Sequence, residues 1–298
     1  MKETTNISVT SAMTVPLKND GILKVSGMDA KKFLQGQLTC DVNDVAISES
    51  RLAAHCNPQG RIVSLFYLAF FQEAYFLLMP SSMIELTMQA LKRYAVFYKV
   101  TLADVSNHFS LMGCVNVDLS NATNIIRINI PSITNRYVVA GELIDLQILQ
   151  NQVKNVDSLS TNDWKFLDMM AGIPAIYPET SAKFLPHEIN LFQFNAISLN
   201  KGCYTGQEII ARMHYRGKLK KHLYHGQIAC QHTIPVPGMD IYRQESHAIL
   251  VIGVIVDVCP NDLGYDALIM LDESDVKDDC LFLENDPHTY FYNITKTS

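Results

Sequence analysis

The octapeptide Lys-Gly-Cys-Tyr-Thr-Gly-Gln-Glu at residues 201–208 is the most informative stretch of the chain. It places the thiol of Cys203 between a lysine and a glycine-flanked turn, two residues before the N-cap of a predicted helix. Thr205 and Glu208 fit the capping-box pattern, with threonine at the N-cap and glutamate three residues later. The positive end of this helix and the ammonium of Lys201 would both favour the thiolate of Cys203, which is the reactive form of cysteine.

The composition is that of an ordinary globular protein. The chain has 298 residues, of which 48% are hydrophobic and 18% charged, and this length suits about two domains. The formal net charge of -6 excludes a global attraction for nucleic acid, so a polyanion site would have to be a local patch. The seven cysteines show no CxxC or paired zinc-ligand spacing, which indicates a reducing compartment and no metal site.

Two further absences bear on location. Residues 1–13 lack the apolar stretch of a signal peptide. The longest apolar runs, near 62–71 and 248–256, are too short to span a bilayer and are typical of buried strands. We therefore expect a cytoplasmic protein without a membrane partner.

The first part of the chain predicts an α+β unit. Asp29 is a candidate N-cap for a helix over 30–38, which carries an apolar face. Apolar segments at 51–56 and 61–71 flank Asn-Pro-Gln-Gly at 57–60, and this turn sequence predicts a hairpin.

A second α+β unit and a β-rich segment follow. Strands are predicted at 125–130 and 136–140, and helices at 142–153 and around Trp164, the latter capped by Ser160 or Thr161 and ended by Gly172 and Pro174. From about residue 222, short β segments separated by Pro, Gly and Asp favour a small antiparallel barrel or sandwich.

Several segments together resemble a known family. The octapeptide, continued by Arg212 and by Arg-Gly at 216–217, resembles the signature of the YgfZ-type folate-binding proteins, within the GcvT-like superfamily of the glycine cleavage T-protein. The segments that resemble the rest of the family lie at 25–39, 53–60, 91–100 and 164–198. The likeness extends from about residue 21 to residue 222 and keeps the order of the family's segments.

The resemblance implies an α+β fold in which ferredoxin-like α/β modules and a C-terminal antiparallel β-barrel surround a central folate-sized hole. The expected domains are a GcvT/YgfZ-like folate-binding region at 1–221, built from two interwoven modules at roughly 1–110 and 111–221, and a small β-barrel at 222–298.

The resemblance also implies a function. The chain would bind tetrahydrofolate or a derivative and act as an accessory protein for the assembly or repair of iron–sulfur enzymes, including one that modifies tRNA. Its partners would be iron–sulfur enzymes or assembly proteins. A folate-dependent one-carbon transferase and a tRNA-binding modification factor are the alternatives.

One departure from the wider group disfavours the transferase. The T-protein branch is expected to carry paired aspartates just after the glycine of the first hairpin. Here Gly60 is followed by Arg-Ile-Val-Ser, so the carboxylate that would assist aminomethyl transfer is absent. The resemblance therefore leaves enzyme activity undecided and favours an accessory role.

Cys203 is the candidate catalytic residue, as a nucleophile, a redox thiol or a transient cluster ligand. One sulfur cannot hold a cluster alone, so a partner would supply the other ligands. The alternative is a small buried hydrophobic side chain. The rest of the motif is expected to support this cysteine through Lys201, Gly202, Tyr204, Gly206, Gln207 and Glu208, with the glycines allowing positive φ or close approach.

The candidate folate contacts lie outside the octapeptide. Trp164, the only tryptophan, would stack on the pterin or aminobenzoyl ring, with core packing as the alternative. Arg212 would bind a folate carboxylate, and Glu188 and Asn190 could meet polar atoms of the ligand. A second aromatic contact expected near the first strand is missing, since residues 18–21 read Lys-Asn-Asp-Gly.

A basic segment surrounds the motif. Residues 201–225 hold six Lys or Arg residues and one acidic residue. This segment could bind a folate glutamate tail or a nucleic-acid phosphate, which would allow weak tRNA contact, or it could be a solvated linker.

Overall fold

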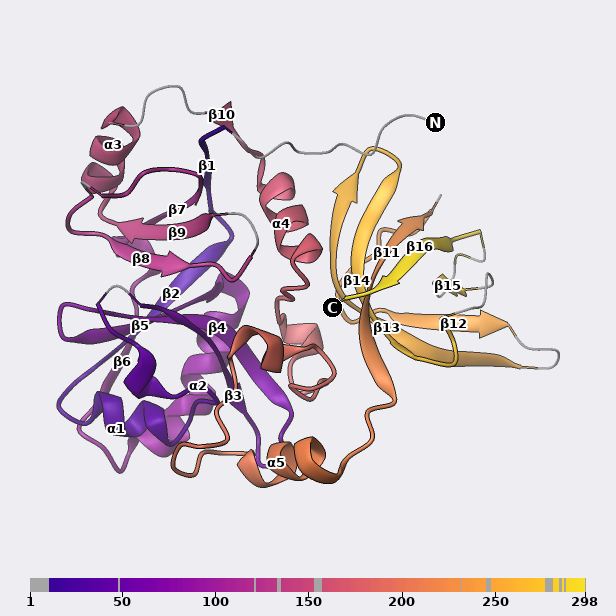
Figure 1. Ribbon diagram of the computed structural model, residues 1–298, viewed down its shortest axis with the longest axis horizontal. Helices are drawn as coiled ribbons and strands as arrows, with labels where there is room; N and C mark the ends of the chain where they lie inside the picture. The colour runs from indigo at the N-terminus through magenta and orange to yellow at the C-terminus, as the bar shows by residue number, and fades with distance from the viewer. Residues whose placement is uncertain are drawn as a thin grey trace.

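The structure is a computed structural model that describes residues 11–297 apart from 48, 121, 133–134, 153–156, 231, 245–247, 277–280, 284–285 and 287. Cys280 and the first ten residues, which entered the predictions above, lie outside this part of the chain. The described residues form three β-sheets, and helix α4 runs between the two N-terminal sheets and the C-terminal one (Figure 1).

The first sheet has five antiparallel strands in the order β3-β4-β5-β2-β6. The strands are β2 (Asp20–Ser26), β3 (Arg51–Cys56), β4 (Ile62–Phe71), β5 (Ala74–Pro80) and β6 (Thr101–Asp104). The pairing of β3 with β4 confirms the predicted hairpin. Helices α1 (Ala30–Gln35) and α2 (Ile84–Ala95) belong to this unit.

Helix α1 differs from the prediction in its length and its cap. It ends at Gln35 rather than at residue 38, because the following residues form contacts with the octapeptide that are described below. Asp29 is at the N-cap position, but its carboxylate accepts a hydrogen bond from the backbone N–H of Lys99 at 2.8 Å and caps no helix amide.

The second sheet has the order β10-β1-β7-β9-β8. Its strands are β1 (Met13–Pro16), β7 (Ser110–Val115), β8 (Ile126–Asn129), β9 (Arg136–Gly141) and β10 (Asp157–Ser158). Strand β1 was not predicted; it places the start of the described chain in the second sheet, before β2 enters the first one. The two α+β units therefore share the N-terminal segment.

The helices of the second unit agree with the sequence patterns. Helix α3 covers Leu143–Gln152, and α4 covers Thr161–Met170. Ser160 caps α4 in a complete capping box with Asp163, which confirms the predicted start. The chain leaves this helix through Gly172, whose φ of 69° favours glycine.

The third sheet has six antiparallel strands in the order β15-β12-β13-β14-β11-β16. They are β11 (Lys221–Ala229), β12 (Asp240–Gln244), β13 (Ile249–Asn261), β14 (Gly264–Asp272), β15 (Leu281–Leu283) and β16 (Tyr290–Lys296). The predicted antiparallel β character is confirmed, and the sheet curls as a half-barrel (Figure 1). Helix α5 (Gln207–Arg216) precedes it.

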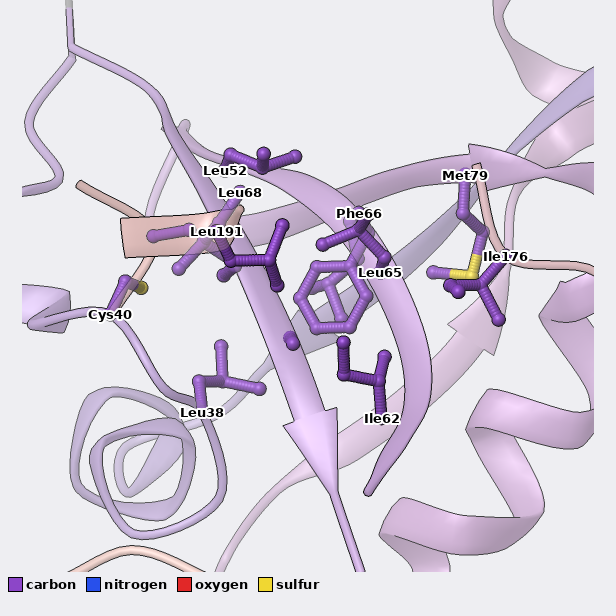
Figure 2. Close-up of a cluster of buried hydrophobic side chains, with 14 of the residues drawn as sticks. Leu38, Cys40, Leu52, Ile62, Leu65, Phe66, Leu68, Met79, Ile176 and Leu191 are labelled. Atoms are coloured by element: carbon purple, nitrogen blue, oxygen red, sulfur yellow. The ribbon is translucent and has the colours of Figure 1, made fainter. Parts of the chain in front are cut away.

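The largest hydrophobic core joins the first sheet to the segment that precedes the octapeptide. Phe66 and Leu52 of the sheet pack in one buried cluster with Ile176 and Leu191 (Figure 2). Leu38 and Cys40, which follow α1, are buried in the same cluster. This packing fixes residues 174–200, which have little regular structure, onto the sheet. Within the described ranges, no helix has the length and apolar character needed to cross a membrane.

Candidate functional site

A cavity of about 430 Å³ lies where the three sheets approach α4. Its volume falls in the range of small-molecule sites. The walls come from distant parts of the sequence and include Asp20 at the start of β2, Tyr67 on β4, Trp164, Lys165 and Asp168 on α4, and Asp257 on β13. The cavity is therefore a product of the complete fold.

Trp164 forms an aromatic wall of this cavity. The side chain is buried, and its ring lies 5.1 Å from the guanidinium carbon of Arg136. A glycine in β7 makes room for the indole: a Cβ atom added at Gly113 would lie 2.7 Å from Cε3 of Trp164. The indole is thus held in place by packing, and it also lines the cavity.

Arg136 and Tyr67 each carry a polar atom that has no partner among the residues that the structure describes. Arg136 donates from Nη1 to Asp168 Oδ1 at 2.7 Å and from Nε to Ser132 Oγ at 3.2 Å. Its Nη2 and the hydroxyl of Tyr67 are buried and find no hydrogen-bond partner in the described part of the chain. Because buried polar atoms are normally hydrogen-bonded, these two are suited to meet a bound molecule.

A second polar group connects α4 to the third sheet. Lys165 Nζ lies 2.6 Å from Asp257 Oδ1 and donates to the hydroxyl oxygen of Tyr177 at 3.0 Å. The Tyr177 hydroxyl in turn donates to Asp257 Oδ1 at 3.1 Å. The side chain of Asp257 is buried and helps to line the cavity.

Two carboxyl groups of the cavity have raised pKa values. Burial, reinforced by the charge of Asp168 and opposed by Lys165, raises the pKa of Asp20 to about 7. Burial also raises the pKa of Asp168 to about 6, against the lowering effect of Arg136. Asp20 can therefore hold or release a proton near neutral pH. Asp20 was not among the site residues predicted from the sequence. It begins a largely apolar strand, and a polar side chain at such a position is a signal of a functional residue.

The octapeptide lies at a different place, against the β3–β4 hairpin. The predicted capping box is wrong: α5 starts at Gln207, its N-cap is Gly206, and no side chain caps it. Thr205 instead donates from its backbone N–H to Gly36 O and from its hydroxyl to Gln37 Oε1, both at 3.3 Å. Thr205 does not cap the helix because Gly206 interrupts the helical backbone, with a φ of 85°. Gly206 also packs closely on the hairpin, where an added Cβ would lie 2.6 Å from Asn57 O.

Lys201 anchors the motif to the segment after α1. Its Nζ donates to Leu38 O at 2.8 Å and to Cys40 O at 2.7 Å, and it lies 5.0 Å from the centre of the Tyr204 ring. Burial lowers the pKa of Lys201 to about 8. The ammonium is engaged by backbone carbonyls, so its first role is to hold the octapeptide in place.

Cys203 is exposed, which contradicts the alternative of a buried hydrophobic side chain. Four other cysteines are buried, and burial raises the pKa of each of their thiols: Cys40, Cys56, Cys114 and Cys259. Cys230 is partly buried, and its thiol pKa is also raised, first by burial. Cys203 is thus the most accessible of the thiols within the described ranges.

The other motif residues have distinct positions. Tyr204 is buried, and its hydroxyl has no partner among the described residues. Gln207 opens α5, and Glu208 is exposed in its first turn. The expected requirement for glycine is confirmed at position 206, where φ is positive and an added Cβ would clash. It is not found at position 202, where an added Cβ would meet no atom within 4 Å.

Of the four predicted folate contacts, only Trp164 lines the cavity. Arg212 is exposed on α5. Glu188 accepts a hydrogen bond from Leu185 N at 2.8 Å, and Asn190 donates from Nδ2 to Thr297 Oγ1 at 2.9 Å. Neither these three residues nor Cys203 are part of the cavity wall.

Comparisons with known proteins agree with this fold. Residues 9–115 match the family model of the GCVT N-terminal domain. The aminomethyltransferase T of the glycine cleavage system from Bartonella henselae has a similar structure, with a TM-score of 0.70 over 97% of this chain and 85% of that one, at 14% identity. This likeness confirms the predicted GcvT-like α+β fold.

Closer relatives carry the name tRNA-modifying protein YgfZ. The one from Colwellia psychrerythraea is 31% identical over 228 residues, which cover 70% of each chain. The one from Photobacterium profundum is 32% identical over 229 residues, which cover 70% of this chain and 68% of the relative.

Proposed function

The chain belongs to the YgfZ family, and on this premise we propose that it binds a reduced folate in the cavity beside Trp164 and serves tRNA modification as an accessory protein of iron–sulfur enzymes. The folate-sized hole expected from the family resemblance is assigned to this cavity.

The observation that carries the proposal is the pairing of an aromatic wall with an unpartnered hydroxyl in the same cavity. A pterin is a flat ring with hydrogen-bond donors and acceptors on its edges. Trp164 offers a face for stacking, while the Tyr67 hydroxyl, which lines the same cavity, offers a hydrogen bond. Asp20 could accept hydrogen bonds from ring N–H groups. The residues of the cavity therefore fit a reduced folate.

A tetrahydrofolate titration tests this proposal. Trp164 is the only tryptophan, so its fluorescence reports directly on the cavity, and binding should also raise the melting temperature. Tyr67→Phe removes one unpartnered hydroxyl and should weaken binding by roughly fivefold. Tyr98→Phe, which changes a residue outside the cavity wall, is the matched control. A wild-type protein that shows neither a fluorescence change nor a thermal shift would refute folate binding.

The role in iron–sulfur enzymes is assigned to Cys203. This thiol is exposed and outside the cavity wall, which suits an encounter with a partner protein that supplies further ligands. Cys203→Ser and Cys203→Ala should fold normally but fail to restore the activity of an iron–sulfur tRNA-modifying enzyme in a deletion strain. Cys230→Ser is the control. Full restoration by both Cys203 variants would exclude a role for the thiol.

One observation favours folate-dependent one-carbon transfer as a second candidate. Asp20 places a carboxyl group with a pKa of about 7 in the cavity, although the first hairpin lacks the family's aspartates. If the chain is a transferase, wild type should release ammonia from an aminomethyl donor while tetrahydrofolate takes up the carbon. Asp20→Asn should abolish this turnover and retain folate binding.

The basic segment supports a third, weaker possibility, direct contact with tRNA. Arg212 and Arg216 are exposed on α5, and the neighbouring Tyr215 is 70% exposed. Exposed cations beside an aromatic ring can bind phosphates and stack on unpaired bases. Affinity for tRNA should then fall steeply as salt rises, and an affinity independent of salt would argue against this contact.

A further inference from the structure

A second hollow, of about 370 Å³, adjoins the cavity at the β8–β9 hairpin. Ile130 lines both spaces and stands between the cavity and the hollow, and Arg136 lines the hollow. The other wall residues include Arg127, Asn129 and Tyr137. None of the residues that line the hollow is acidic.

Arg136 provides a buried donor in the wall of the hollow and is hydrogen-bonded to Asp168 of the cavity wall. The residue is only 2% exposed, and its Nη1 and Nε are engaged by Asp168 and Ser132. Its Nη2 is buried without a partner in the described ranges. Burying a donor of a charged group without a hydrogen bond is costly, so this atom indicates a site for an acceptor.

Arg127 provides a second guanidinium in the wall of the hollow. It lies 3.9 Å from the centre of the Tyr137 ring and donates from Nε to Asn129 Oδ1 at 3.1 Å. It forms no ion pair within the part of the chain that the structure describes. Stacking on the ring orients the group, and its positive charge remains available to an anion.

We propose that this hollow is an anion subsite for the poly-γ-glutamate tail of the folate held in the cavity. This inference rests on the proposed function. A folate is neutral and aromatic at one end and carries carboxylates at the other. The cavity has its carboxyl groups at Asp20, Asp168 and Asp257, while the hollow has two guanidinium groups and no carboxylate. The tail would therefore be oriented past Arg136 toward Arg127.

The proposal assigns the tail to a different arginine from the one that the motif suggested. Arg212 lies on α5 and lines neither the cavity nor the hollow. Arg127 lines a space that shares the wall residue Ile130 with the cavity. Continuity with the ring site is what a tail subsite requires.

Calorimetric titration with tetrahydrofolate monoglutamate and triglutamate tests the subsite. Wild type should bind the triglutamate about tenfold more tightly, since charge-assisted hydrogen bonds favour the longer tail. Arg127→Gln should lose this preference and keep its affinity for the monoglutamate. Arg93→Gln makes the same change at an exposed position on α2, outside both spaces, and should behave as wild type. The preference should also weaken as salt concentration rises.

The outcomes separate the two proposals. Equal binding of both forms by wild type, or an unchanged preference in Arg127→Gln, would overturn the subsite and leave folate binding in place. If wild type bound neither form, folate binding itself would fail, and the tail subsite with it.

Discussion

Arg136 Nη1 and Asp168 Oδ1 lie 2.7 Å apart and join the first residue of β9 to α4, where Asp168 lines the cavity. The arginine side chain is completely buried, whereas the aspartate side chain is 27% exposed. The carboxylate is thus the counter-ion of a guanidinium that has no access to solvent.

Asp168→Ala should destabilise the protein by about 3 kcal/mol, because it leaves the Arg136 charge buried without a counter-ion. Urea unfolding measures the loss. The double variant Arg136→Met, Asp168→Leu removes both charges and should recover most of the stability. A single variant as stable as wild type would show that the ion pair has no net role.

Asp20 should make stability fall as pH rises from about 4 to about 7. The folded carboxyl holds its proton up to a pKa of about 7, while an unfolded aspartate loses it near the ordinary value of 3.8. The folded state therefore binds more protons between these two values, and rising pH favours unfolding. Asp20→Asn should be more stable than wild type at pH 8 by roughly 1–2 kcal/mol, since the group is only partly buried, and this gain should vanish below pH 4.

Urea denaturation across this pH range checks the expectation. Asp262→Asn, in an exposed turn, serves as the control and should leave the pH profile as it is in wild type. An identical profile for Asp20→Asn and wild type would contradict the raised pKa of Asp20.

Cys203 should react with iodoacetamide before the other described cysteines. It is exposed, while burial protects Cys40, Cys56, Cys114 and Cys259 and also keeps their thiols protonated. Peptide mapping by mass spectrometry after brief labelling of the native protein measures this order. Labelling of the four buried cysteines at the rate of Cys203 would mean that the native core opens.

Gly206→Ala should cost about 2–4 kcal/mol, because φ is positive and the new Cβ would approach Asn57 O to 2.6 Å. Gly202→Ala is the matched control within the same motif, since its Cβ would meet nothing within 4 Å. It should change stability by less than about 0.5 kcal/mol. Thermal unfolding of the two variants compares them, and equal losses would contradict the packing described here.

The features that were predicted correctly depend on residues close together in the chain. The hairpin of β3 and β4 follows from a four-residue turn, and the start of α4 follows from Ser160 and Asp163. The octapeptide was also recognised as the defining motif. Its local interpretation failed at Thr205, because the contact between Gly206 and Asn57 depends on the tertiary fold.

The cavity could not be predicted in the same way. Asp20, Tyr67, Trp164 and Asp257 come from four separate elements, and no spacing in the sequence relates them. Only Trp164 was found, through the family resemblance. Asp257 carries no local sequence signal that its carboxylate is buried in this wall.

The Lys165–Asp257 ion pair has a consequence for how the protein reaches its working state. Asp257 arrives with the third sheet, long after Asp20 and Tyr67 in order of synthesis, and it completes the cavity wall only when β13 meets α4. A chain that has folded its first two sheets alone would lack this wall. A ligand of the cavity would then bind completely folded molecules and not partly folded ones. Its concentration would set the fraction of chains that is protected from proteolysis.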